Sequence, residues 1–174
     1  YKTAAAAGKR VQALCEAKNH ALVLEDAVLE RSVAGIINST YGCAGQRCMA
    51  LPVICVQESI ADEFVALLKK KAMELKLGAA YLPESQLGPL VSTGQKESVE
   101  AAIARGVSEG AELVLDGRNA TVAGCENGYF VGPTIFDHVK PEHSVGNDEI
   151  FGPVTCIKRV KDFEEGLAIM NANR

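Results

Sequence analysis

Short apolar runs and amphipathic helical patterns alternate along this chain. The apolar runs that predict strands lie at residues 11–15, 21–24, 51–56, 112–115, 134–136 and 154–160. Apolar residues recur at the helical period between them, at residues 29–37, 60–75, 99–107 and 163–170. Strands that alternate with helices of this length predict an α/β fold, a doubly wound sheet in three layers.

One predicted helix has a clear start signal and a clear stop signal. Ser92 and Gln95 have the spacing of a capping box, and Val99 and Ile103 follow at the helical period. Gly110 then ends the apolar pattern, as expected for a helix C-terminus. The sequence therefore predicts a helix that begins after Ser92 and stops before Gly110.

Composition indicates one globular domain over residues 1–174. The chain has 174 residues, of which 48% are hydrophobic and 23% charged, enough to bury a substantial core. Its net charge of -4 and the absence of a basic stripe argue against a nucleic-acid partner. No apolar run reaches the roughly 18 residues that a membrane span requires, so we expect no membrane partner.

The cysteines do not form a metal-binding or disulfide pattern. Six are present, with no CxxC pair and no zinc spacing: Cys15, Cys43, Cys48, Cys55, Cys125 and Cys156. The histidines, His20, His138 and His143, are too scattered for a triad or a metal site. We therefore expect no metal, and free thiols in a reducing intracellular compartment.

Cys48 is the cysteine whose surroundings suggest chemistry. It lies in a predicted loop, between the small-residue turn at 41–45 and the predicted strand at 51–56. Gly45 allows a tight turn and close approach of a substrate, and Arg47 places a positive charge beside the thiol, which favours the thiolate. The local pattern fits both an activated nucleophile and a small structural thiol.

Three ordered segments carry a resemblance to a known family. They read Gly-Gln-Arg-Cys-Met-Ala-Leu from Gly45, Glu-Ile-Phe-Gly-Pro-Val from Glu149, and Ala-Lys-Asn-His from Ala17. Together they resemble the aldehyde dehydrogenases, and within these the methylmalonate-semialdehyde dehydrogenase branch, which acylates coenzyme A and acts in valine degradation.

The resemblance implies a role for individual residues. Cys48 would be the catalytic nucleophile, and Arg47 would bind the carboxylate of a semialdehyde substrate. Glu149 would hold the nicotinamide ribose of NAD, and Phe151 would pack near the nicotinamide. The implied partners are a small semialdehyde and coenzyme A as co-substrate, and the implied assembly of the full-length protein is a homo-oligomer.

The release step separates two enzymatic alternatives. Hydrolytic family members carry a glutamate four residues before a lysine. If that lysine corresponds to Lys18, the glutamate position is occupied here by Leu14, which cannot act as a general base. The acylating branch usually has asparagine there, and Glu16 replaces an expected glycine. Alternation along the predicted strand at 11–15 would point Glu16 to the same face as Leu14, so a hydrolytic enzyme with Glu16 as base stays open. A catalytically silent assembly or regulatory domain is the third alternative.

The chain is expected to be a catalytic-domain piece of a longer polypeptide. It begins at Tyr1 without methionine and contains no glycine-rich dinucleotide fingerprint. In the family the cofactor-binding half lies upstream and the oligomerisation segment downstream, so the isolated piece should have little or no activity. The expected compartment is the cytoplasm of a bacterium, or the mitochondrial matrix if the source is eukaryotic.

Overall fold

A five-stranded sheet forms the centre of the computed structural model, which describes residues 1–173. The strand order is β1-β2-β5-β4-β3. Four of these strands run parallel, and β3 pairs antiparallel with β4 at one edge. The strands are β1 (His20–Val23), β2 (Val53–Gln57), β3 (Glu112–Leu115), β4 (Thr134–Asp137) and β5 (Val154–Val160).

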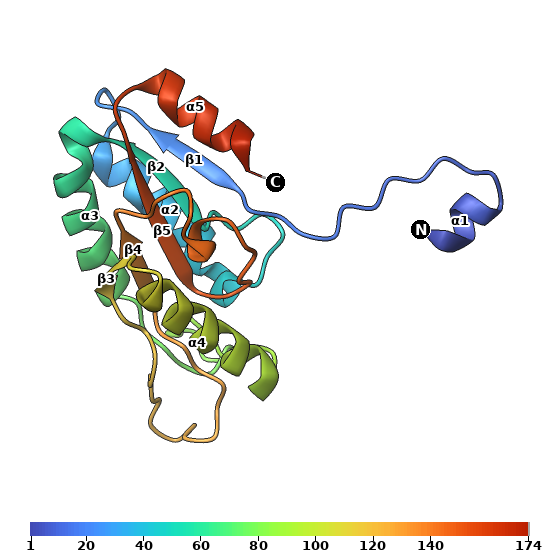
Figure 1. Ribbon diagram of the computed structural model, residues 1–174. Coiled ribbons are helices and arrows are strands. Elements are labelled where there is room, and N and C mark those ends of the chain that lie inside the picture. Colours follow the sequence, from blue (N-terminus) through green and yellow to red (C-terminus); the bar gives the residue numbers. More distant parts are fainter. Residues whose placement is uncertain (174) are drawn as a thin grey trace.

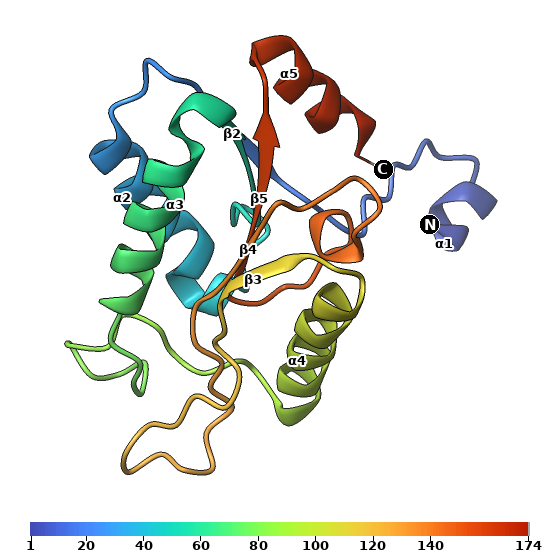
Figure 2. The same cartoon turned by 60° about the vertical axis from the view of Figure 1, so that its left-hand side comes forward.

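Helices cover both faces of the sheet, so the predicted three-layer α/β architecture is confirmed (Figure 2). One face packs against α2 (Leu29–Tyr41) and α3 (Glu58–Met73), and the other against α4 (Thr93–Ser108) and α5 (Phe163–Ala172). Alternate residues of β2 serve the two layers: Ile54 joins the core beneath α2 and α3, whereas Val53 joins the core beneath α4. Both side chains are fully buried, which explains why the central strands read as continuous apolar runs.

The strand predicted at residues 11–15 does not form. This segment has no regular secondary structure, and with the short helix α1 (Lys2–Ala6) it projects away from the sheet (Figure 1). Leu14 is 83% exposed. The prediction was wrong because an apolar run becomes a strand only where a neighbouring strand supplies hydrogen-bond partners, and β1 at the adjacent sheet edge begins only at His20.

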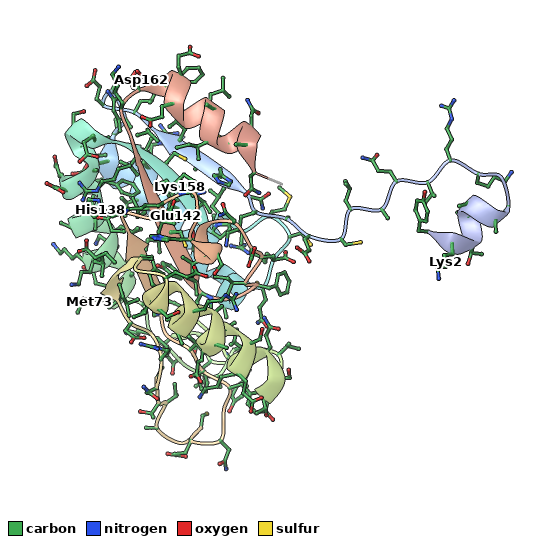
Figure 3. The ribbon with its side chains drawn as sticks, in the orientation of Figure 1. Lys2, Met73, His138, Glu142, Lys158 and Asp162 are labelled. Carbon is green, nitrogen blue, oxygen red and sulfur yellow. The ribbon has the colours of Figure 1, made fainter. Side chains whose placement is uncertain are left out.

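Two helices begin at side-chain caps. Ser92 accepts a hydrogen bond from the Gln95 N–H, which confirms the predicted start of α4. Asp162, labelled in Figure 3, accepts one from the Glu165 N–H at the start of α5. The Gln95 side chain does not complete the capping box, because its amide donates instead to the backbone carbonyls of Ile150 and Phe151.

No helix within residues 1–173 is long and apolar enough to cross a membrane.

Two 3-10 turns, η1 (Gly42–Gly45) and η2 (Ser144–Gly146), lie in the connections before β2 and β5. The η1 turn follows α2 directly and contains two residues in the left-handed region, Cys43 and Ala44. These connections carry two of the three sequence segments singled out above, so their shape determines where those residues lie.

Candidate active site

The three segments converge because each one directly precedes one of three adjacent parallel strands. Residues 17–19 lead into β1, residues 45–52 into β2 and residues 149–153 into β5. Adjacent parallel strands begin at the same edge of a sheet. Segments that are more than 100 residues apart in the sequence therefore meet at the amino edge of the strands.

Cys48 occupies a tight turn between η1 and β2. The Ala50 N–H donates to the Arg47 carbonyl at 3.1 Å, which closes the turn around Cys48 and Met49. The Asn19 side-chain amide donates to the carbonyls of Cys48 and Ala50, each at 2.8 Å. These bonds confirm that Cys48 lies in a loop and show that the loop is pinned to the residue before β1.

Gly45 permits direct contact between the loop that carries Cys48 and the loop that carries Phe151. Its φ is +71°, and a Cβ built on it would lie 2.1 Å from the carbonyl oxygen of Gly152. Only glycine satisfies both constraints, because a side chain would be strained at this φ and would collide with backbone. The turn before Cys48 therefore rests directly on the backbone that follows Phe151.

The loop from Glu149 to Phe151 is held through its backbone carbonyls. The Gln95 amide donates to the carbonyls of Ile150 at 3.2 Å and Phe151 at 2.9 Å. The Lys18 ammonium donates to the Asp148 carbonyl at 2.6 Å. Phe151 itself has a φ of +55°, a conformation that a non-glycine residue adopts only where neighbouring contacts hold it.

The side chains predicted to act together share one surface pocket. Cys48, Glu149 and Phe151 line a pocket of about 480 Å³, together with Leu14 and Glu16. Glu149 is exposed and Phe151 is 38% exposed, so a carboxylate and a ring face of this pocket are accessible. The structure therefore brings these three predicted site residues together around one cavity, and a narrower cleft beside it is lined by all four, Arg47 included.

Cys48 combines an exposed thiol with a backbone donor. Among the described residues, no hydrogen bond uses the Cys48 N–H, which leaves this group available to a developing oxyanion. Two other thiols, Cys55 and Cys156, are buried in the sheet, and burial raises the pKa of each. A raised pKa keeps those thiols protonated, so they are poor nucleophiles.

Arg47 does not line the larger pocket. Its guanidinium Nη2 donates to the carbonyls of Asn38 and Ser39, at the C-terminal end of α2. A cation is favourable there because the helix dipole is negative at that end. Arg47 does line the narrower cleft, together with Cys48, Glu149 and Phe151. Its charged group, however, contacts the end of α2.

Leu14 and Glu16 both border the pocket, although not through strand alternation. The segment that carries them is irregular, so the expected common strand face does not exist. Glu16 is exposed and lines the Cys48 pocket, as does Leu14. The geometry thus places one apolar and one acidic side chain near the thiol.

Two residues that hold the site together, Asn19 and Gln95, carry no functional signal of their own in the sequence. Asn19 was noted only as part of a matching segment, and Gln95 only as half of a capping box. Their signal was weak: each is a polar side chain next to a predicted element boundary.

Within residues 1–173 no group of three or more histidine, cysteine or acidic side chains is arranged to hold a metal ion.

Comparison with known proteins gives consistent matches over the whole chain. Residues 1–174 match the aldehyde dehydrogenase family. Malonate-semialdehyde dehydrogenase 2 of Oceanobacillus iheyensis is 49% identical over 174 residues, which are 100% of this chain and 36% of that protein. The chain therefore spans about a third of the length of the curated relatives it matches.

Solved structures agree with this match. A protein described as a methylmalonate-semialdehyde dehydrogenase from Sinorhizobium meliloti 1021, complexed with NAD, superposes with a TM-score of 0.95 at 36% identity, covering 99% of this chain and 35% of that one. Methylmalonate-semialdehyde dehydrogenase from Oceanimonas doudoroffii superposes with a TM-score of 0.94 at 38% identity, covering 99% of this chain and 36% of that one.

Proposed function

This chain belongs to the aldehyde dehydrogenase family, and we propose that it is the catalytic domain of an enzyme that oxidises a malonate-type semialdehyde to an acyl-coenzyme A with NAD. The observation that carries the proposal is the shared pocket of Cys48, Glu149 and Phe151. The names of the relatives, malonate- and methylmalonate-semialdehyde dehydrogenase, support the substrate class. The proposed domain is residues 1–174, with the cofactor-binding half and the oligomerisation segment outside it.

The first half of the proposed reaction is acylation of Cys48. The thiolate adds to the aldehyde carbonyl carbon, and the carbonyl oxygen becomes an oxyanion that accepts a hydrogen bond from the Cys48 N–H. Collapse of this adduct releases a hydride and leaves a thioester on Sγ.

The residues of the pocket fit the nicotinamide end of NAD, which supplies the hydride acceptor when bound. Glu149 presents a free carboxylate that can accept from two ribose hydroxyls, and the Phe151 ring offers an apolar face for a flat heterocycle. Because Cys48 lines the same pocket, a nicotinamide held there would lie beside the thiol.

The second half is release of the acyl group from Cys48. The thiolate of coenzyme A attacks the thioester carbonyl, the bond to Sγ breaks, and Cys48 leaves as a thiolate. Leu14 lines the pocket but cannot abstract a proton from water. An apolar side chain in that place favours transfer to an external thiol over hydrolysis.

The first test measures whether turnover requires coenzyme A. The full-length enzyme, given NAD and malonate semialdehyde, should form about one NADH per active site in a burst and then need coenzyme A for steady turnover. Steady NADH formation without any thiol, with free acid as product, would contradict the acylating reaction.

A hydrolytic reaction with Glu16 as base is the second candidate, favoured by the position of Glu16 in the Cys48 pocket. In that case Glu16→Gln would lower the rate of acid formation by about 10²-fold or more, the usual range for loss of a general base. Under the acylating proposal the same variant leaves coenzyme A-dependent turnover within about twofold. The third alternative, a silent assembly or regulatory domain, predicts no NADH burst from any variant.

Arg47 is proposed as the ligand of the substrate carboxylate. To bind it, the guanidinium must turn from the α2 carbonyls toward the cleft that Arg47 lines. Arg47→Met should therefore raise the KM for malonate semialdehyde about 10-fold, a loss of roughly 1.4 kcal/mol, with little change in the KM for propanal. An equal rise for both aldehydes would assign Arg47 to the support of the turn instead.

Two properties of the full-length protein complete the proposal. We propose a homo-oligomer, and we propose the bacterial cytoplasm as its compartment. The bacterial origin of the matched relatives supports the compartment, as do the free thiols of this chain.

A further inference from the structure

We propose that Lys18 and Asn19 are positioning residues with separate tasks, Asn19 for the Cys48 turn and Lys18 for the loop that carries Glu149. This inference rests on the proposed function, because it assigns the two loops to acylation and to cofactor binding. Neither residue is proposed to touch the reacting atoms.

The two side chains lie on opposite sides of one extended segment. Successive residues of an extended chain point in opposite directions. Here the Asn19 amide reaches the Cys48 turn and the Lys18 ammonium reaches the Asp148 carbonyl. The segment before β1 therefore binds one loop with each side chain.

Asn19 makes contacts that are specific to an amide. Its Nδ2 supplies both protons, one to the Cys48 carbonyl and one to the Ala50 carbonyl, each at 2.8 Å. The first of these carbonyls belongs to Cys48 itself and the second to Ala50, the last residue of the turn. The two bonds therefore hold the backbone that carries the Cys48 side chain. A carboxylate of the same shape has no proton to donate and would repel both carbonyl oxygens.

Lys18 occupies a costly place for a charge. The residue is 9% exposed, and among the ion pairs of the described residues none includes Lys18. Burial lowers its pKa, because a buried ammonium loses its hydration. Among residues 1–173, its acceptor is the backbone carbonyl of Asp148, the residue before Glu149. The contact thus places a desolvated cation at the start of the loop that carries Glu149.

Lys158 offers a matched comparison. It is also a buried lysine, 5% exposed, and burial also lowers its pKa. It lies on β5, where Figure 3 labels it, and its ammonium is 3.4 Å from the Asn147 side-chain oxygen. It makes no bond to the Cys48 turn or to residues 148–151 among the described contacts, so its loss tests the effect of removing a buried charge from this region.

If the two tasks are separate, each variant of the full-length enzyme should change one of two quantities: the single-turnover rate of NADH formation or the dissociation constant of NADH. Asn19→Asp should lower the single-turnover rate of NADH formation by about 10- to 100-fold, the range for a misplaced reacting group, and leave the dissociation constant of NADH unchanged. Lys18→Met should raise that dissociation constant by about 10-fold and leave the single-turnover rate at saturating NAD within about threefold.

Two further variants keep the test decisive. Lys18→Arg retains a donor and should recover most of the NADH affinity. Lys158→Met should leave both measurements near wild type when it is measured at a temperature where Lys158→Met and Lys18→Met are equally folded. The proposal is overturned if Asn19→Asp and Lys18→Met change both measurements together, or if Lys158→Met reproduces the Lys18→Met result. Absence of an NADH burst from the wild type would instead overturn the proposed function.

Discussion

Replacement of Cys48 by serine is expected to lower NADH formation by the full-length enzyme by about 10³-fold or more, the scale of loss when a catalytic nucleophile is removed. A serine hydroxyl fits the same turn, so the fold should persist. It cannot replace the thiol because a hydroxyl ionises far less readily than a thiol, and the pocket holds no histidine that could act as a base for it. Initial-rate measurements with NAD, malonate semialdehyde and coenzyme A test this expectation.

Cys43→Ser is the matched control for that variant. Cys43 is also an exposed free thiol, it lies only five residues before Cys48, and it lines neither pocket that contains Cys48. Its activity should remain within about twofold of wild type. Equal losses in both variants would mean that general damage to the η1 turn, rather than loss of a nucleophile, explains the effect.

The second large effect is expected at Gly45. Gly45→Ala puts a Cβ at a φ of +71°, 2.1 Å from the Gly152 carbonyl oxygen, so the two loops must separate. A left-handed conformation alone costs a residue with a Cβ about 1–2 kcal/mol. With the backbone collision added, we expect a loss of about 3 kcal/mol or more in the free energy of unfolding, at the upper end of usual single-residue effects. Urea unfolding measures it.

Gly94→Ala is the corresponding control. Gly94 lies in the first turn of α4, and a Cβ added there meets nothing within 4 Å. Alanine is the better helix former, so this variant should be neutral or more stable by up to about 1 kcal/mol. If Gly45→Ala proves as harmless as Gly94→Ala, the contact between the Cys48 and Glu149 loops does not hold the site together.

The fold was predictable where a hydrophobic period and a partner element agreed. The runs at 51–56 and 154–160 became β2 and β5, because each is long, apolar and placed between helical patterns. The run at 11–15 resembled them locally, yet it lies beyond the start of β1 at the sheet edge and pairs with no strand among the described residues. Pairing is a tertiary property, and a local pattern does not contain it.

The sequence selects residues that lie together in the structure, but it does not reveal the contacts that hold them there. The resemblance selected Arg47, Cys48, Glu149 and Phe151, which line one cleft, and the last three also share the larger pocket. The contacts of Asn19 and Gln95 with backbone carbonyls depend on which strands become neighbours, and periodicity does not specify strand order. The contact of Arg47 with α2 was also not predictable, because it depends on how η1 turns the chain back onto the helix end.

The thioester on Cys48 is the most direct test of the central claim. The full-length enzyme should be mixed with NAD and malonate semialdehyde without coenzyme A, quenched in acid, digested and analysed by mass spectrometry. An acyl adduct on the peptide that contains Cys48, which disappears when coenzyme A is added before the quench, is the predicted result. An active enzyme that carries no adduct on Cys48, or carries it on another cysteine, would contradict this account.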